Sequence, residues 1–156
     1  MAILSPDRKT IKSKSYRHGG AFVKDRLSMS NASKVCVLAT SSQSYLDPKG
    51  YVGLAVEQQP ASDLADLILM GIDGTIVGGG ASYSHLEANA LKGARIRGAG
   101  VHLAVTYNPR LNTVTFTREV ASITLNLKGY FVDPNYKPSL RFYVGAAGTN
   151  SALTLQ

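Results

Sequence analysis

The sequence predicts a mainly β protein, an antiparallel β-sandwich or jelly roll with one or two short helices and a disordered basic N-terminal arm. Three observations support this fold class. Apolar residues alternate along successive runs between 101 and 127, glycine and proline separate other short apolar runs, and cations gather at the N-terminus. At 156 residues the chain has room for one domain. We expect a flexible basic arm over residues 1–34 and a single β domain over residues 35–156.

The predicted arm holds most of the charge. Residues 1–34 contain eight lysines and arginines against two aspartates, so almost all of the formal +7 of the chain lies there. The segment is rich in serine and has no sustained apolar periodicity. It therefore cannot bury enough surface to offset the entropy lost on ordering. A short helix over residues 22–27 is the one element that its pattern allows.

The first half of the β domain shows two strands and then an ambiguous segment. Residues 35–39 form a continuous apolar run of strand length. A proline and a glycine within residues 47–50 mark a turn, after which residues 51–57 form a second strand. Residues 64–72 follow a break at Pro60. They predict either a helical turn that enters a strand or one buried strand.

Glycine dominates the middle of the chain. Residues 71–80 include five glycines among ten residues, which indicates tight turns around a short β segment at residues 75–77. Residues 82–92 then predict a short helix, with Leu86, Ala90 and Leu91 on one side and Gly93 as its terminator.

A β-meander follows and is the clearest pattern in the chain. Apolar residues occupy every second position over residues 101–107, 113–117 and 121–127, which is the period of a strand. The segment 108–112, Asn-Pro-Arg-Leu-Asn, predicts a hairpin loop between the first two runs. Residues 140–144 predict a last strand. The tail from residue 145 to 156 is small and polar, and we expect it to be loosely held or to contact a neighbour.

The chemistry of the chain favours no catalytic site. The three histidines, His18, His85 and His102, have no orienting acid at a useful spacing for nucleophilic catalysis. Cys36 lies inside an apolar run and predicts a buried hydrophobe, and a single cysteine excludes an intramolecular disulfide. The glycine cluster lacks the lysine of a phosphate-binding loop. We expect no enzyme activity, no cofactor and no metal.

The basic arm is the feature that predicts a partner. Lysines and arginines on a flexible segment neutralise phosphates and release condensed counterions, which favours nucleic acid, most simply RNA. An acidic membrane or protein surface is the alternative partner. The candidate nucleic-acid-binding residues are Arg8, Lys9, Lys12, Lys14, Arg17, Lys24 and Arg26.

Two further properties bear on assembly and location. Charged residues make up 17% of the chain, below the roughly 25% of typical soluble domains, and a charge-poor surface favours a subunit that other copies cover. No apolar run has the length of a signal peptide or a membrane span. We expect a homo-oligomer that is neither secreted nor membrane-spanning.

A basic arm ahead of a charge-poor β domain resembles the organisation of small icosahedral virus coat proteins. The resemblance covers the chain in outline and includes no diagnostic motif. It implies a structural protein that assembles into a shell, packages nucleic acid through its arm, and is found in the virion or the host cytoplasm. Two alternatives remain: a viral movement or matrix protein that binds nucleic acid or membrane without a closed shell, and a small-ligand protein or enzyme with a site near His85, Glu87 and His102.

Overall fold

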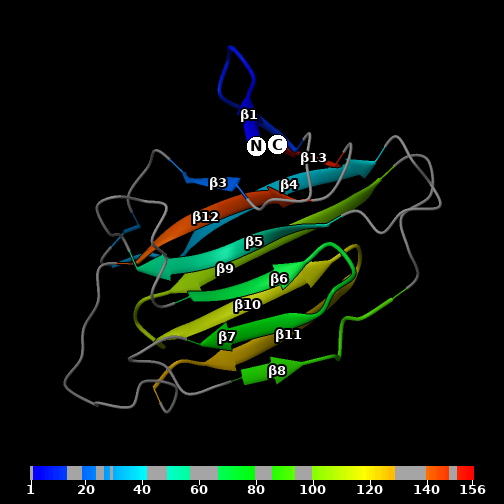
Figure 1. The fold of residues 1–156 in the computed structure, drawn as a ribbon. Coiled ribbons are helices and arrows are strands. Elements are labelled where there is room, and N and C mark those ends of the chain that lie inside the picture. Colours follow the sequence, from blue (N-terminus) through cyan, green and yellow to red (C-terminus); the bar gives the residue numbers. More distant parts are fainter. Residues whose placement is uncertain are drawn as a thin grey trace.

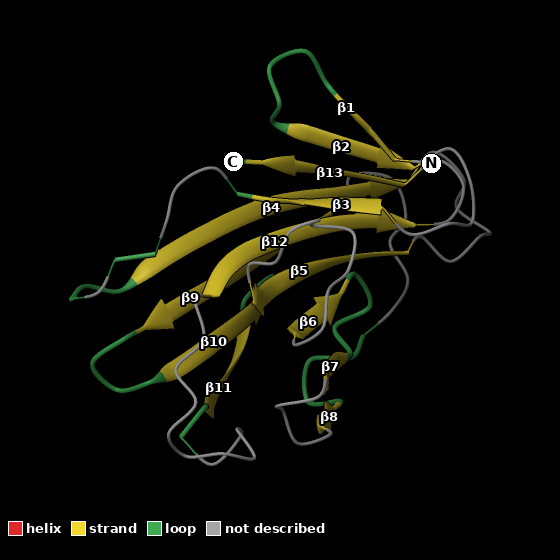
Figure 2. Ribbon diagram, turned by 60° about the vertical axis from the view of Figure 1, so that its left-hand side comes forward, coloured by secondary structure: helices red, strands yellow, loops and turns green. Residues whose placement is uncertain are grey.

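The computed structural model shows two antiparallel β-sheets packed face to face (Figure 1). It describes residues 2–13, 19–23, 27–28, 30–41, 49–56, 67–79, 86–93, 100–128, 140–147 and 151–156, and these contain thirteen strands and no helix. The predicted β-sandwich is therefore confirmed. Figure 2 shows the two layers from the side, with β9, β10 and β11 in one layer and β5, β6 and β7 in the other.

One sheet has seven strands. Their order across the sheet is β1 (Ala2–Leu4), β2 (Thr10–Ser13), β13 (Ser151–Leu155), β4 (Ser33–Ser41), β9 (Val101–Asn108), β10 (Thr113–Arg118) and β11 (Ala121–Asn126).

The other sheet has six strands. Their order is β3 (Gly19–Phe22), β12 (Leu140–Ala147), β5 (Lys49–Val56), β6 (Leu67–Gly71), β7 (Ile76–Gly79) and β8 (Leu86–Ala88).

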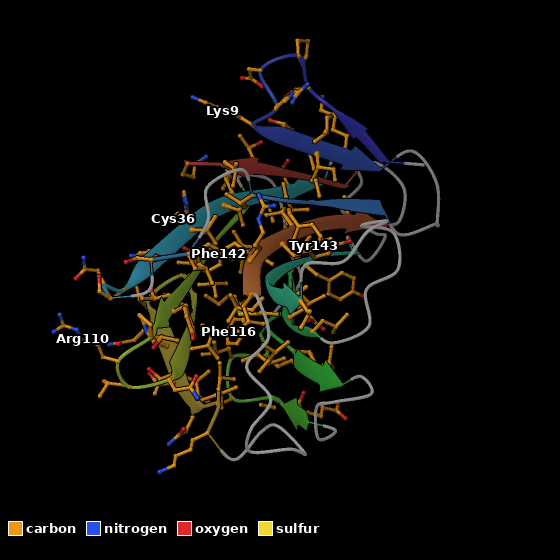
Figure 3. All side chains as sticks on the ribbon, turned by 90° about the vertical axis from the view of Figure 1, so that its left-hand side faces the viewer. Lys9, Cys36, Arg110, Phe116, Phe142 and Tyr143 are labelled. Atoms are coloured by element: carbon orange, nitrogen blue, oxygen red, sulfur yellow. The ribbon has the colours of Figure 1, made fainter. Side chains whose placement is uncertain are left out.

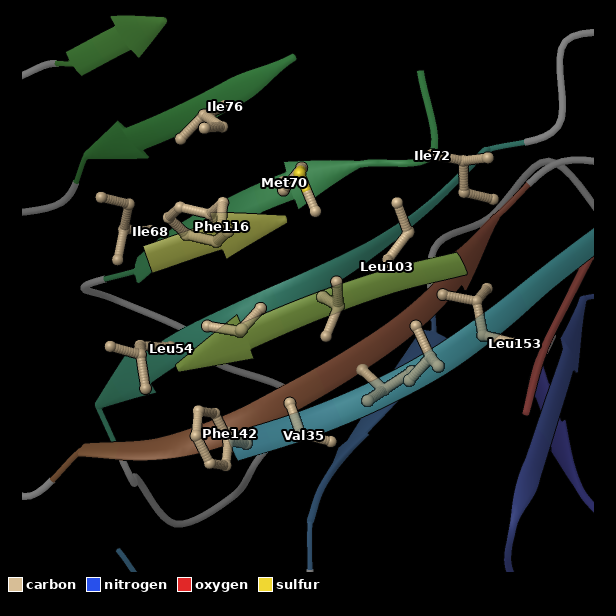
Figure 4. Packing of buried hydrophobic residues seen from close by; sticks show 14 of the residues in the cluster. Val35, Leu54, Ile68, Met70, Ile72, Ile76, Leu103, Phe116, Phe142 and Leu153 are labelled. Atoms are coloured by element: carbon tan, nitrogen blue, oxygen red, sulfur yellow. The ribbon is translucent and has the colours of Figure 1, made fainter. Parts of the chain in front are cut away.

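The core lies between the sheets and follows from the two-residue period of the strands. Every second side chain of β4, β9 and β10 points inward, and so does every second side chain of β5, β6 and β12. Figure 4 shows these apolar side chains meeting between the layers. The largest fully buried ones include Phe116, Leu54, Ile68, Met70, Ile76, Leu103 and Leu153.

The predicted meander is present as β9, β10 and β11. Phe116 pairs with Val105 on one side and with Ile123 on the other, so the three apolar runs share the inner face. The predicted hairpin loop is confirmed as well. The side chain of Asn108 accepts hydrogen bonds from the backbone N–H groups of Arg110 (3.0 Å) and Leu111 (3.2 Å), and Asn112 has a φ of 51°.

The prediction of a disordered arm is wrong for the part of residues 1–34 that the structure describes. Strand β2 pairs with β13, and β3 pairs with β12, so both sheets include a piece of the predicted arm. Ile11 on β2 is 5% exposed and belongs to the core. A single apolar residue between polar ones gives no periodicity to detect, yet it suffices to anchor a strand whose partner lies at the other end of the chain.

The predicted tail and helices also need correction. Strand β13 runs between β2 and β4 with Leu153 buried, so residues 151–155 are a central strand and not a loose tail. Residues 67–71 form β6, which agrees with the strand in both predictions for residues 64–72, whereas the segment predicted as a helix from residue 82 forms β8 over Leu86–Ala88. Neighbouring strands supply the backbone partners that local propensity alone did not predict. Residues 82–85, 62–66 and 24–26 lie outside the described part of the chain.

An arginine joins the two sheets at one end. Arg118, the last residue of β10, donates a hydrogen bond from Nε to the carbonyl oxygen of Ile72 (3.0 Å), in the turn between β6 and β7. The same turn is ordered by Asp73, whose carboxylate accepts hydrogen bonds from the N–H (2.9 Å) and hydroxyl (3.1 Å) of Thr75. The β6–β7 turn is thus held both by its own side chains and by the opposite sheet.

Within the described residues, none belongs to a helix that is long and apolar enough to cross a membrane.

Candidate binding face

The outer faces of the two sheets differ in character. On the seven-stranded sheet the outward positions are mostly polar, as expected of a sheet face in water. They include Thr10, Lys12, Lys34, Thr106, Thr115, Thr117, Ser122, Thr124 and Asn126. On the six-stranded sheet the outward positions are mostly apolar or aromatic. They include Phe22, Tyr51, Ala55, Leu67, Leu69, Val77 and Tyr143.

We call the second set, together with Arg141, the aromatic face. The central residues of this face pair with one another across all six strands. Tyr143 pairs with Phe22 on one side and with Gly53 on the other. The row, from β3 to β8, is Phe22, Tyr143, Gly53, Leu69, Val77 and Glu87. Figure 3 shows Tyr143 on the side of β12 opposite to Phe142, which points into the core.

Tyr143 forms the centre of the aromatic face. Its ring meets that of Phe22 edge to face, with 5.7 Å between centroids and 68° between planes. The ring also lies over Gly20, where any added Cβ would collide with the phenol. Burial raises the pKa of Tyr143 to about 12, so its hydroxyl stays protonated at neutral pH.

Arg141 provides a positive charge beside these rings. Its guanidinium lies 5.6 Å from the centroid of the Phe22 ring, a cation–π arrangement, and Nη2 donates a hydrogen bond to the carbonyl oxygen of Val23. Both contacts come from the segment that contains β3. Arg141 is therefore held in one place at the edge of the face and is only partly buried.

The aromatic face has a closed centre and an accessible rim. Ala55, Leu69 and Tyr143 are 0%, 3% and 4% exposed. Phe22, Tyr51 and Leu67 pack against them but remain half-buried. Half-buried rings on a rigid sheet have few conformations to lose, and each offers a flat apolar surface with a polar group nearby. Such a surface can hold a ligand without performing a reaction.

The residues considered for catalysis do not meet. Glu87 lies on the outer face of the six-stranded sheet, whereas His102 is exposed on the outer face of the seven-stranded sheet, with the core between them. His85 falls outside the described residues. In the described part of the chain, no three His, Cys, Asp or Glu side chains cluster as a metal site would require.

Cys36 differs from its prediction. It lies on an outward position of β4 and is half-buried, because its run of five apolar residues alternates between the core and the outer face. Val35, Val37 and Ala39 take the inner positions.

Three of the seven predicted nucleic-acid-binding residues are described. Arg8 and Lys9 are exposed in the turn between β1 and β2, where Arg8 has a φ of 60°. Lys12 is exposed on β2. Asp7 orders this turn by accepting hydrogen bonds from the Ser5 hydroxyl and the Lys9 N–H, and these bonds lower its pKa. Lys14, Arg17, Lys24 and Arg26 lie outside the described residues, and nucleic-acid binding by all seven stays a prediction.

Sequence reasoning missed the aromatic face, although one signal was present. Residues 67–72 and 51–56 are apolar at nearly every position, which is typical of strands that are buried on both faces. The meeting of Phe22 with Arg141 left no such signal, since 118 residues separate Arg141 from Val23, the neighbour of Phe22.

Comparisons with known proteins support the fold. No protein-family model and no curated protein matches the sequence. Among solved structures, the SPRY domain of human HERC1 has a TM-score of 0.63 at 10% identity, covering 99% of this chain and 91% of that one. The carbohydrate-binding module CBM66 from Bacillus subtilis has a TM-score of 0.60 at 9% identity, covering 100% and 88%. The basic winged bean lectin with Tn-antigen has a TM-score of 0.54 at 10% identity, covering 99% of this chain and 90% of that one.

These comparisons contradict the predicted coat-protein function. The solved structures that share the fold include SPRY, lectin and carbohydrate-binding domains, together with an alginate lyase, a sialidase and a toxin. The prediction relied on a basic N-terminal segment followed by a β domain, a combination that many unrelated proteins have. At identities this low, the similarity shows a common fold and nothing more specific.

Proposed function

We propose that this chain is a recognition domain that binds a carbohydrate on the aromatic face and catalyses no reaction. The observation that carries the proposal is the partly buried rim of Phe22, Tyr51 and Leu67 on the outer side of the six-stranded sheet. A sandwich needs apolar residues only between its sheets, so aromatic rings on the outer side that keep part of their surface in solvent are available to a ligand. Several solved proteins with this fold are named for carbohydrate binding, which supports the choice of ligand.

The chemistry of the face suits a sugar ring. The C–H groups on one side of a pyranose pack on an aromatic ring, and its hydroxyls need polar partners close by. Phe22 and Tyr51 supply half-buried rings. Arg141 supplies a cationic hydrogen-bond donor group beside Phe22.

The test is binding to a panel of neutral and acidic glycans, followed by titration calorimetry with the tightest. Tyr51→Leu removes the flat ring but keeps an apolar side chain, and we expect it to weaken binding by about tenfold or more. Thr115→Ala, on the outer face of the other sheet, is the control and should bind as the wild type does. Equal affinity of wild type and Tyr51→Leu, or binding to no glycan in the panel, would contradict the proposal.

A further inference from the structure

The four outer edges of the two sheets are protected to different degrees. Strands β1 and β8 have three residues each, β8 includes Glu87, and β3 has four residues, two of them glycine. Short or charged edge strands offer little to pair with. The remaining edge, β11, has six residues, Ala-Ser-Ile-Thr-Leu-Asn, with no charge and no proline. Among the described residues β11 pairs only with β10.

The free edge of β11 has hydrogen-bonding groups in a defined order. The N–H of Leu127 donates to the carbonyl oxygen of Asn112, just before β10, with an N–O distance of 2.9 Å. In an antiparallel ladder alternate residues bond to the same neighbour, so odd-numbered residues of β11 face β10. Ser122, Thr124 and Asn126 consequently direct their N–H and C=O groups away from the sheet.

Apolar side chains accompany this edge. Ile123 and Leu125 point toward the core and pack against it, and each is only partly buried. Val120, in the turn before β11, is fully exposed. An edge that offers both backbone groups and partly buried aliphatic side chains fits another β-strand of the same kind.

We propose that two copies of this chain pair through β11, antiparallel and about a twofold axis at Thr124. In this register Ser122 of one copy lies opposite Asn126 of the other, and Ile123 lies opposite Leu125, so inward side chains meet inward side chains. No charges oppose each other along the strand. Lys128 comes next to the turn of the second copy that contains Glu119, and both side chains are exposed, so opposite charges meet at each end.

The pairing has a geometric consequence for the proposed function. A twofold axis normal to the sheet joins the two seven-stranded sheets into one and leaves both aromatic faces on the same side. Two faces turned the same way can bind one repetitive ligand together, which raises apparent affinity without new contacts.

The test uses charge at the axis. We expect the wild type to sediment as a dimer, and Thr124→Lys, which places like charges opposite each other, to weaken dimerisation by about a hundredfold or more. Thr115→Lys is a matched control. Thr115 pairs with Thr124 and shares a hydroxyl hydrogen bond of 2.8 Å with it, so the control loses the same bond and gains the same charge one strand further in. It should remain a dimer.

Mixing variants tests the register. Thr124→Lys and Thr124→Glu, each monomeric alone, should form a heterodimer when combined. A monomeric wild type, equal dissociation of Thr115→Lys, or no heterodimer in the mixture would overturn the proposal.

A second experiment tests the pairing even if the lysine variant fails to fold. With Cys36→Ser as background, Thr124→Cys should cross-link under mild oxidation, since hydrogen-bonded antiparallel partners have Cα atoms about 5.5 Å apart. Thr115→Cys in the same background should not. Cross-linking of both variants alike, or of neither, would overturn the pairing.

Discussion

Tyr143 links the electrostatics of the aromatic face to the stability of the fold. Its ring is buried against Phe22 and Gly20, and its pKa rises to about 12 from the ordinary value of 10.0 because burial disfavours the phenolate. Below pH 10 the hydroxyl is protonated in both the folded and the unfolded chain, and pH has no effect through this group. Above pH 10 the unfolded chain loses the proton first.

We therefore expect the free energy of unfolding to fall between pH 10 and pH 12, by at most about 1.4 kcal/mol per pH unit from this residue. Tyr143→Phe keeps the ring and removes the ionisable group, so its stability should decline less over the same range. Urea titrations of both proteins at several pH values measure the difference. Tyr107, whose pKa burial also raises, contributes equally to both. Parallel curves for the two proteins would show that Tyr143 is not buried as described.

Ile11 tests whether the N-terminal segment belongs to the sandwich. It is 5% exposed among core residues, while its neighbour Lys12 is exposed on the outer side of the same strand. We expect Ile11→Ala to cost about 2–4 kcal/mol of unfolding free energy, as truncations of buried aliphatic residues do. Lys12→Ala should change it by less than about 0.5 kcal/mol. Chemical denaturation measures both free energies. A negligible effect of Ile11→Ala would contradict the packing of β2 and support the prediction of a disordered arm.

Among the elements, two arginine side chains that bond distant backbone carbonyls differ in burial. Arg118 connects β10 to the turn between β6 and β7 through the carbonyl oxygen of Ile72, in a partly buried position. Arg110 makes a comparable bond to the carbonyl oxygen of Ser30 (2.8 Å), but at an exposed site. Water can replace the second bond far more easily than the first.

We expect Arg118→Ala to lower the free energy of unfolding by about 1.5–3 kcal/mol, because a bond from a charged donor is lost and the Ile72 carbonyl keeps no equivalent partner. Arg110→Ala should cost about 0.5 kcal/mol or less. Thermal unfolding of the two variants beside the wild type gives the comparison. Equal effects would mean that the link between the sheets contributes no more to stability than the exposed bond does.

Elements with several apolar residues in a strand pattern were predictable from the sequence, and those with a single buried residue were not. The three strands of the meander pair with their neighbours in the chain, so alternation and an Asn-Pro turn suffice to place them. Strands β2 and β13 each contribute a single buried aliphatic residue, Ile11 and Leu153, and they pair with each other across almost the whole chain. No pattern within either segment indicates that partner.

The candidate site was less predictable than the fold for the same reason. Apolar runs on β5 and β6 indicated burial on both faces, but the aromatic face also needs Phe22 and Arg141, which come from opposite ends of the sequence. Charge distribution, the strongest signal in composition, pointed instead to the N-terminal segment. The described part of that segment forms strands, so its charged side chains lie on the outer face of a sheet and in the turn between β1 and β2.

For the whole molecule, the asymmetry between the two outer faces unites the proposals. The seven-stranded sheet has a polar outer face and, at β11, an edge with no further partner among the described strands, which suits pairing with a second copy. The six-stranded sheet has short edges and an aromatic outer face, which suits a ligand. Pairing and recognition thus use different parts of the sandwich, and the Thr124 variants should bind a glycan with unchanged affinity per site.

The most direct test of glycan recognition is a map of the binding site by NMR, with isotope-labelled protein and the tightest glycan from the panel. We predict that the resonances that shift belong to the rim of the aromatic face, namely Phe22, Tyr51, Leu67 and Arg141, while Thr115 and His102 on the opposite sheet do not move. Shifts confined to the outer face of the seven-stranded sheet, or to the turn at Arg8 and Lys9, would contradict the account and assign recognition to another surface.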